Sequence, residues 1–377
     1  MSKTNLIKNE FLSTGQHSSK NSKEYIPVNK GHFELDTEER VQAFHDKLGR
    51  GWETEYREYR SCWVTLPREK RVRDYPILLD VELSSACNLS CPMCYTTTEH
   101  FKKNVTRKFM EWELFQKIVD EVAGKVYSLR LSWRGESTLH DQFVDAVRYA
   151  KNSGIKEVSF LTNGSKLTLE YFIELTKAGA DWISVSFDGL GEEYEKIRKP
   201  LKYRETYAKL RDAMEYKNSE NLEKPVIKVQ TIWPAIRKNP EVYYNTIRDV
   251  SDLVAFNPII DYLEKDTEIV YEENFSCPQL YERLFVSSTG DVMMCNSDEY
   301  GEEIVGNAWE KKIHDIWHGA RLKRIRELHG RHDGFRELAT CRRCFFPRKT
   351  EVNEMAIVNG RTIMVENYVN RCQVIGE

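Results

Sequence analysis

Residues 77–94 read ILLDVELSSACNLSCPMC, a short apolar run followed directly by a loop with three cysteines. The run Ile77–Leu83 has the length and composition of a buried β-strand. Cys87, Cys91 and Cys94 follow it in the spacing C-x3-C-x2-C. Three thiolates on one short loop can hold three irons of a cubane iron–sulfur cluster and leave the fourth iron without a protein ligand. The stretch therefore predicts a metal site with one open position at the end of a strand.

Two other interpretations of this loop are a zinc site and a set of unreactive buried thiols. Structural zinc takes four ligands, and the fourth ligand near the three cysteines would have to be His100. Unreactive thiols rarely gather three to a loop. We favour the iron–sulfur cluster over both.

Apolar runs recur downstream and alternate with amphipathic stretches, as in parallel strands connected by helices. The expected strands are Ile77–Leu83, Val126–Trp133, Glu157–Leu161, Trp182–Phe187, Val226–Ile232 and Leu253–Pro258. The expected helices are Glu111–Val122, Asp141–Asn152, Leu169–Ala178, Tyr203–Tyr216 and Glu241–Val250. Six strand–helix units in about 185 residues predict an α/β fold with a partial (β/α)6 TIM-type barrel rather than a closed eight-unit barrel.

The sequence predicts five segments. The polar residues 1–30 predict a disordered arm. Residues 31–74 predict a collar that contains a helix from Thr37 to Leu48, capped by Thr37, and a stretch rich in aromatic residues and arginine. The barrel is expected over 75–262, a small auxiliary-cluster domain built from a β-hairpin and a helix over 263–350, and a tail over 351–377.

Composition and charge exclude several classes of protein. The 377 residues include 56 Lys and Arg against 59 Asp and Glu, so no general basic surface exists for nucleic acid or an anionic membrane. No apolar stretch approaches the roughly 20 residues of a membrane-spanning helix. Since the amino terminus also lacks the apolar core of a secretion signal, we expect a cytoplasmic protein whose cysteines are reduced.

A second group of cysteines lies in the expected small domain. Cys277 and Cys295 flank a predicted hairpin, and Cys341 and Cys344 form a C-x2-C pair. A helix is expected after the hairpin, from about Ile313 to Leu328. Four thiolates in this arrangement suit either a structural zinc ion or a fully ligated [4Fe–4S] cluster, and spacing alone does not separate the two.

The loop C-x3-C-x2-C after the first strand of a partial barrel resembles the radical S-adenosylmethionine (radical SAM) superfamily. The resemblance implies that the open iron binds the amino and carboxylate groups of S-adenosylmethionine (SAM). It also implies that one-electron reduction of SAM yields a 5′-deoxyadenosyl radical, which abstracts a hydrogen atom from the substrate. An external one-electron reductant such as flavodoxin or ferredoxin is then required.

The same resemblance implies which residues contact SAM. They are Met93, Gly135, Glu136, Ser186 and Arg198. Gly135 and Glu136 match the second Gly and the Glu of the family's Gly-Gly-Glu-Pro segment. In this chain, Arg134 replaces the first Gly and Ser137 replaces the Pro.

Each of the weaker matches has a structural alternative. The stretch Leu161–Gly164 is similar to a family turn, but it could equally be a tight turn without further function. Ser186 could be a small side chain packed inside the barrel. Arg198 could be a solvated charge at a helix end.

The second cysteine group resembles the Twitch form of the SPASM auxiliary-cluster domain, which favours an iron–sulfur cluster over zinc. The resemblance continues through Gly306-Asn307, Ile313, Ile316-Trp317 and Arg321. The further cysteines of the larger SPASM form are absent. The expected cofactors are therefore SAM and two [4Fe–4S] clusters, one that binds SAM and one auxiliary. The ligand spacing is especially similar to that of aminocyclitol dehydrogenases of this superfamily, which oxidise a secondary alcohol.

A fully ligated auxiliary cluster favours electron transfer, and hence an oxidative reaction. The leading hypothesis is a radical SAM oxidoreductase that dehydrogenates or otherwise modifies a small polar molecule such as a sugar, aminocyclitol or nucleotide sugar. Modification of a ribosomally made peptide is the alternative, although the segment before Tyr75 is short for a peptide-recognition domain. A non-catalytic zinc-binding module is a third hypothesis.

Three features are left over. Cys62 is expected to be a buried thiol, and Cys372 either an ordinary tail residue or a hydrogen-atom donor to a substrate radical. A basic run between Arg321 and Lys349, with four histidines in or near it, suits either a solvated face or a grip for a phosphorylated substrate.

Overall fold

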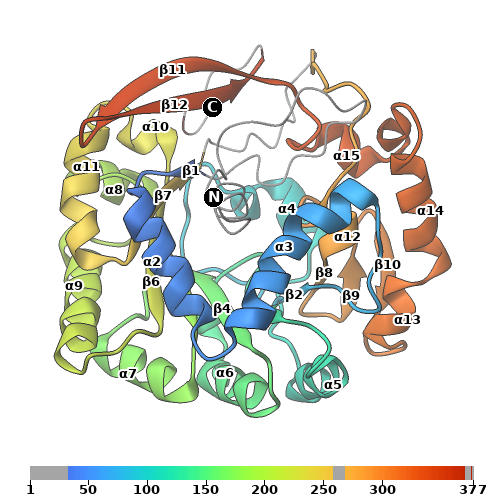
Figure 1. Cartoon of the computed structure of the whole chain (residues 1–377), viewed down its shortest axis with the longest axis horizontal. Helices are drawn as coiled ribbons and strands as arrows, with labels where there is room; N and C mark the ends of the chain where they lie inside the picture. The colour runs from blue at the N-terminus through green and yellow to red at the C-terminus, as the bar shows by residue number, and fades with distance from the viewer. Residues whose placement is uncertain (1–32, 258–267, 370–374, 376–377) are drawn as a thin grey trace, which may run out of the picture.

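A computed structural model of the chain describes residues 33–257, 268–369 and 375. Ten strands form one curved sheet in the order β1-β7-β6-β5-β4-β3-β2-β8-β9-β10, and β11 and β12 form a separate hairpin (Figure 1). The strands are β1 (Phe33–Glu34), β2 (Leu78–Val81), β3 (Ser128–Arg130), β4 (Glu157–Thr162), β5 (Trp182–Ser186), β6 (Val226–Ile232), β7 (Leu253–Asn257), β8 (Arg283–Val286), β9 (Asp291–Met293), β10 (Ile304–Asn307), β11 (Thr350–Val358) and β12 (Arg361–Tyr368).

The six predicted strands are present as β2 to β7, and neighbouring members are parallel, which confirms the partial barrel. The β3 strand is shorter than expected, and residue 258 lies outside the described residues. The predicted hairpin is β8–β9, but β8 also pairs in parallel with β2. The segment that carries the second cysteine group therefore continues the barrel sheet.

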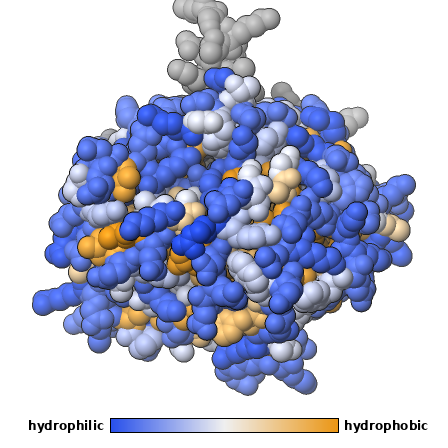
Figure 2. Space-filling model, turned by 90° about the horizontal axis from the view of Figure 1, so that it is seen from below, coloured by the Kyte–Doolittle hydropathy of each residue, from blue (hydrophilic) through white to orange (hydrophobic). Residues whose placement is uncertain are grey.

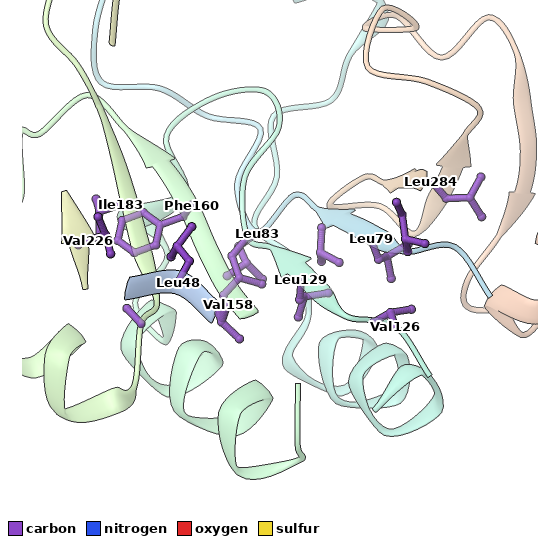
Figure 3. Close-up of a cluster of buried hydrophobic side chains, with 14 of the residues drawn as sticks. Leu48, Leu79, Leu83, Val126, Leu129, Val158, Phe160, Ile183, Val226 and Leu284 are labelled. Carbon is purple, nitrogen blue, oxygen red and sulfur yellow. The ribbon is translucent and has the colours of Figure 1, made fainter. Parts of the chain in front are cut away.

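An outer layer of helices covers the sheet (Figure 1). The predicted helices are present as α5 (Trp112–Val122), α6 (Phe143–Asn152), α7 (Leu169–Ala178), α9 (Tyr203–Ser219) and α11 (Pro240–Ile247). The short helices α4 (Glu99–Asn104), α8 (Gly191–Ile197), α10 (Trp233–Ile236) and α12 (Gln279–Glu282) were not predicted. Figure 3 shows apolar side chains from neighbouring strands, such as Leu79, Leu129 and Val158, gathered in one buried cluster.

Two helices close one end of the barrel. Helix α2 (Glu38–Gly49) begins after Thr37, whose side chain accepts a hydrogen bond from the backbone of Arg40, so the predicted cap is confirmed. Helix α3 (Glu53–Glu69) follows, and both lie across the near opening in Figure 1. Lys47 pairs with Asp252 at 2.6 Å, just before β7 begins. The collar therefore covers the amino-terminal ends of the strands. It leaves their carboxyl ends available for a functional site.

The end of the chain contains a hairpin where we expected only a tail. Strands β11 and β12 are antiparallel and join through Asn359-Gly360, which both have positive φ angles. Asn-Gly between two alternating runs is a strong hairpin signal, so the sequence did contain this information. The predicted helix between about Ile313 and Leu328 is divided at Gly319 into α13 (Ile313–Trp317) and α14 (Ala320–His329), and α15 (Ala339–Arg343) follows.

The face of the molecule that is seen from below in Figure 2 is mostly polar. Figure 2 shows the molecule from below, where hydrophilic residues predominate and hydrophobic ones form small scattered groups. Within the described residues, none of the helices has the length and apolar character needed to cross a lipid bilayer.

Candidate functional site

The first three cysteines lie on the loop after β2, at the open end of the barrel. The amide of Cys94 donates to the carbonyl of Cys91 at 3.0 Å, a tight turn that brings the two residues together. Cys91 is buried, and Cys87 and Cys94 are partly exposed; none forms a disulfide. Burial raises the pKa of Cys91 to about 11, although Arg198 opposes the shift. The Cys91 thiol therefore needs a bound metal to be a thiolate near neutral pH.

The segment that follows β3 contacts the backbone of this loop at Gly135. Its φ of +63° is in the left-handed region, and a Cβ atom there would lie 2.5 Å from the carbonyl oxygen of Ala86. The neighbouring amide of Glu136 donates to the same oxygen at 2.8 Å. Only glycine fits both the backbone conformation and the close approach.

Glu136 connects the ends of β3 and β4. Its carboxylate is buried and accepts hydrogen bonds from Thr138 Oγ1 at 2.6 Å, Thr162 Oγ1 at 2.8 Å and the amide of Asn163 at 2.6 Å. Burial raises the pKa of Glu136, and these hydrogen bonds oppose the shift. The carboxylate is thus occupied within the protein, where it holds neighbouring strand ends together.

Asn163 was not among the predicted site residues, yet it reaches the cysteine loop. Its Nδ2 donates to Asn88 Oδ1 at 2.9 Å and lies 3.9 Å from the Cys87 sulfur. The stretch Leu161–Gly164 is therefore more than a tight turn, because it contacts the predicted cluster ligands. The similarity to a family turn was the signal that could have identified Asn163.

Arg134, where the chain departs from the family pattern, joins the barrel to the second cysteine segment. Its guanidinium makes two hydrogen bonds to Glu82, at 2.6 and 2.7 Å, and a third to the carbonyl of Glu299 at 3.0 Å. Glu82 also accepts from the amide of Ser288 at 3.0 Å. A buried ion pair with these further hydrogen bonds is well satisfied. Arg134 therefore links the strand before the cysteine loop to the segment that carries the second cysteine group.

Arg198 lies beside the cysteine loop rather than in solvent. Its Nη1 is 3.8 Å from the Cys91 sulfur, and its Nη2 is 2.5 Å from Asp188 Oδ2. The side chain is 14% exposed, so the interpretation as a solvated helix-end charge is wrong. Its Nε is buried without a hydrogen-bond partner, which leaves one guanidinium donor for a ligand such as a carboxylate.

The two remaining predicted contacts lie on neighbouring segments of the same end of the barrel. Met93 is half-buried within the cysteine loop, and Ser186 is half-buried at the carboxyl end of β5. The structure thus brings Met93, Gly135, Glu136, Ser186 and Arg198 to the strand ends that carry the cysteine loop.

The second group of cysteines lines one small cavity. Cys277, Cys295, Cys341 and Cys344 share it with Phe275, Met294, Phe346 and His329, among others. Burial raises the pKa of all four thiols, and the neighbouring thiols raise the pKa of Cys295 and Cys341 further. Four mutually adjacent thiols in a largely apolar enclosure fit a fully ligated cluster, which would hold them as thiolates.

Two protein-family models match the chain. The model of the radical SAM superfamily matches residues 81–237, and that of the SPASM iron–sulfur cluster-binding domain matches residues 277–345. The chain therefore contains a radical SAM domain and a SPASM iron–sulfur cluster-binding domain.

Relatives of this radical SAM protein differ in what they act on. It is 28% identical over 305 residues to a tungsten-containing aldehyde ferredoxin oxidoreductase cofactor-modifying protein of Pyrococcus furiosus. The alignment covers 75% of this chain and 78% of the relative. A 7,8-dihydro-6-hydroxymethylpterin dimethyltransferase of Methanocaldococcus jannaschii is 25% identical over 118 residues, but only 23% of its length is covered.

Among solved structures, BtrN in complex with AdoMet and 2-DOIA has a TM-score of 0.51 at 17% identity. That match covers 73% of this chain and 94% of BtrN. The enzyme anSMEcpe with bound AdoMet has a TM-score of 0.53 at 17% identity, with 73% and 88% covered. These similarities establish the shared fold.

The radical SAM and SPASM domains together indicate that this chain binds SAM and two [4Fe–4S] clusters. The two cysteine groups fit this composition, one with three thiols and one with four. When bound at the first group, the cluster and SAM together supply a carbon-centred radical that abstracts hydrogen.

We expect Arg198→Lys to raise the Kd for SAM by about tenfold or more, because a single ammonium group cannot pair with Asp188 and also place a donor where Nε lies for a carboxylate. Equilibrium binding of SAM to the anaerobically reconstituted protein measures the effect. Lys196→Gln is the matched control, since Lys196 is 67% exposed on the same segment. Equal affinities in all three proteins would show that Arg198 does not contact SAM.

The remaining sequence features have separate locations. Cys62 is buried in α3, as expected, and Cys372 lies outside the described residues. The basic run does not converge on one site: Arg326 and Arg348 bond to backbone carbonyls, whereas Arg324 is exposed on α14. The phosphate-grip interpretation is therefore not supported. The run consists of the following residues: Arg321, Lys323, Arg324, Arg326, Arg331, Arg336, Arg342, Arg343, Arg348 and Lys349.

The four histidines also separate. His314 and His318 hydrogen-bond to Asp74 beside the start of the barrel, and His332 is exposed. His329 alone of the four lies in the auxiliary cavity.

Proposed function

We propose that this radical SAM enzyme oxidises a small polar molecule, such as a sugar, an aminocyclitol or a nucleotide sugar, inside its barrel. The observation that carries the proposal is the closed set of four cysteines around one cavity. A cluster ligated by all four has no open iron for a substrate, so electron transfer is its simplest role. An electron acceptor close to a radical site favours oxidation.

The inner face of the barrel supports a polar substrate. Leu79 and Val81 belong to the buried apolar cluster. Because side chains alternate along a strand, we infer that Asp80 between them points to the inner face. Arg130 lies 3.5 Å and Arg283 3.7 Å from its carboxylate. Lys228 alternates with apolar residues of β6 in the same way, and burial lowers its pKa to about 8. Charged groups on this face suit a hydroxylated or charged molecule better than an apolar one.

Peptide modification receives less support. Within residues 33–74, the described elements β1, α2 and α3 are used to extend the sheet and close the barrel, and no separate peptide-recognition domain is present there. The relative from Pyrococcus furiosus is named as a cofactor-modifying protein, which also favours a small molecule.

A substrate carbinol carbon loses a hydrogen atom to the radical derived from SAM. The carbon-centred substrate radical then gives one electron to the auxiliary cluster and its hydroxyl proton to water, which leaves a carbonyl group. The reductant supplies the electron that starts the cycle.

Anaerobic incubation with carbinol-deuterated substrates tests the proposal. We expect deuterium in 5′-deoxyadenosine and a carbonyl product from the parent enzyme. The variant Cys341→Ala/Cys344→Ala lacks half of the auxiliary ligands, so we expect it to transfer deuterium but to form carbonyl product at least about 100-fold more slowly, since its substrate radical has no electron acceptor.

Cys62→Ala serves as the control for loss of a buried thiol. Deuterium transfer only from peptides would exclude the small-molecule substrate. Undiminished carbonyl product from the double variant would exclude the oxidative role of the auxiliary cluster.

A further inference from the structure

His329 lies in the cavity of the four auxiliary cysteines, although it is not one of the predicted cluster ligands. It is the last residue of α14 and is 2% exposed. Its ring packs against Phe275 and Phe335, with centroids 6.1 and 6.2 Å away. The imidazole is therefore held in place on two sides by aromatic rings.

Both ring nitrogens contact backbone or side chains of the cysteine ligands. The amide of Cys277 donates to Nδ1 at 3.2 Å, and Nε2 lies 3.5 Å from the Cys341 sulfur. His329 thus spans two ligand-bearing segments that are 64 residues apart in sequence (341 minus 277).

These contacts decide the tautomer. A backbone N–H can only donate, so Nδ1 must present its lone pair and carry no proton. In a neutral imidazole the proton is then on Nε2, which faces Cys341. A ring whose Nδ1 accepts a hydrogen bond carries only one N–H and is neutral. The N–H group at Nε2 consequently points at a predicted cluster ligand.

A hydrogen bond to a ligand sulfur has a known electrostatic effect. Reduction adds negative charge to a cluster and its thiolates, so a donor aimed at sulfur stabilises the reduced form more than the oxidised form. The effect is strongest where water is excluded, as in this apolar enclosure.

We propose that His329 is a positioning residue that donates Nε2–H to the Cys341 sulfur and so raises the reduction potential of the auxiliary cluster. The inference requires the auxiliary cluster but not the proposed reaction. Its tests therefore measure the cluster directly, and failure of the oxidation experiment would leave it standing.

The test compares auxiliary-cluster potentials in a background without the first cluster, Cys87→Ala/Cys91→Ala/Cys94→Ala, by anaerobic redox titration followed by EPR. We expect His329→Phe, which keeps an aromatic ring but has no donor, to reduce the equilibrium constant for electron uptake about tenfold. For a one-electron couple this is a midpoint lower by about 59 mV. His329→Gln restores a side-chain N–H and should recover most of the shift.

His332→Phe is the matched control, because His332 is 78% exposed and three residues away. An unchanged or higher midpoint in His329→Phe with full iron content would overturn the proposal. If His329→Phe does not retain its cluster, nitrogen-15 NMR of the imidazole in the otherwise unmodified background decides. A proton on Nε2 supports the proposal, and a proton on Nδ1 overturns it.

Discussion

The variant Cys87→Ala/Cys91→Ala/Cys94→Ala is expected to form no detectable 5′-deoxyadenosine and to bind about half of the roughly eight irons that two [4Fe–4S] clusters contain. The three thiols are the predicted ligands on the loop after β2, and alanine offers no metal ligand in their place. The four auxiliary thiols line a separate cavity and are unchanged. Iron and sulfide analysis with chromatographic detection of 5′-deoxyadenosine measures both effects.

Cys62→Ala is the matched control for this variant. Cys62 is also buried, but it lies in α3 at the collar, where Arg73 Nη1 contacts its sulfur at 3.2 Å. We expect this variant to keep its full iron content and to cleave SAM at the parent rate. Residual SAM cleavage by the triple variant, or full iron binding, would refute the assignment of the first cluster.

The second large effect is expected from Gly135→Ala, which should reduce SAM cleavage at least about 100-fold. A methyl group at this position would lie 2.5 Å from the Ala86 carbonyl oxygen and 2.7 Å from that of Ser84. Both carbonyls belong to the backbone of the loop that leads into Cys87, so the loop must move. Displacements of about 1 Å in a reacting site cost about 100-fold in rate. Turnover in the presence of excess reductant measures the loss.

Backbone strain and steric displacement are separable here. Gly124 has a similar φ of +72°, but a Cβ atom there would meet nothing within 4 Å. Gly124→Ala therefore suffers the strain of a positive φ, about 1 kcal/mol, without the collision. We expect it to cleave SAM at nearly the parent rate. Equal losses in the two variants would mean that strain alone explains the effect, and that Gly135 has no special relation to the cysteine loop.

Much of the fold was predictable because its signals are local. The strands β2 to β7 show as short apolar runs, and the three cysteines on one loop are adjacent in sequence whatever the tertiary structure. The Asn359-Gly360 turn belongs to the same class, although we predicted a tail there. The ligand roles of the cysteines and the contacts to SAM remain predictions.

Other features could not be predicted, because they depend on residues that are distant in the chain. The pairing of β8 with β2 joins segments about 200 residues apart, and parallel pairing leaves no turn signal between the partners. The same holds for Arg134, which replaces a family glycine and meets Glu82 and the carbonyl of Glu299.

Features set by residues that are close in sequence could be predicted, whereas contacts between residues that are distant in sequence could not. Ligand spacing and strand periodicity are properties of neighbouring residues, so the sequence alone identified the family, the barrel and both cysteine groups. The surroundings of those cysteines were decided by packing: Arg198 beside Cys91, Gly135 against Ala86, and His329 between Cys277 and Cys341. Burial and hydrogen bonding at these points require segments that only the folded chain brings together.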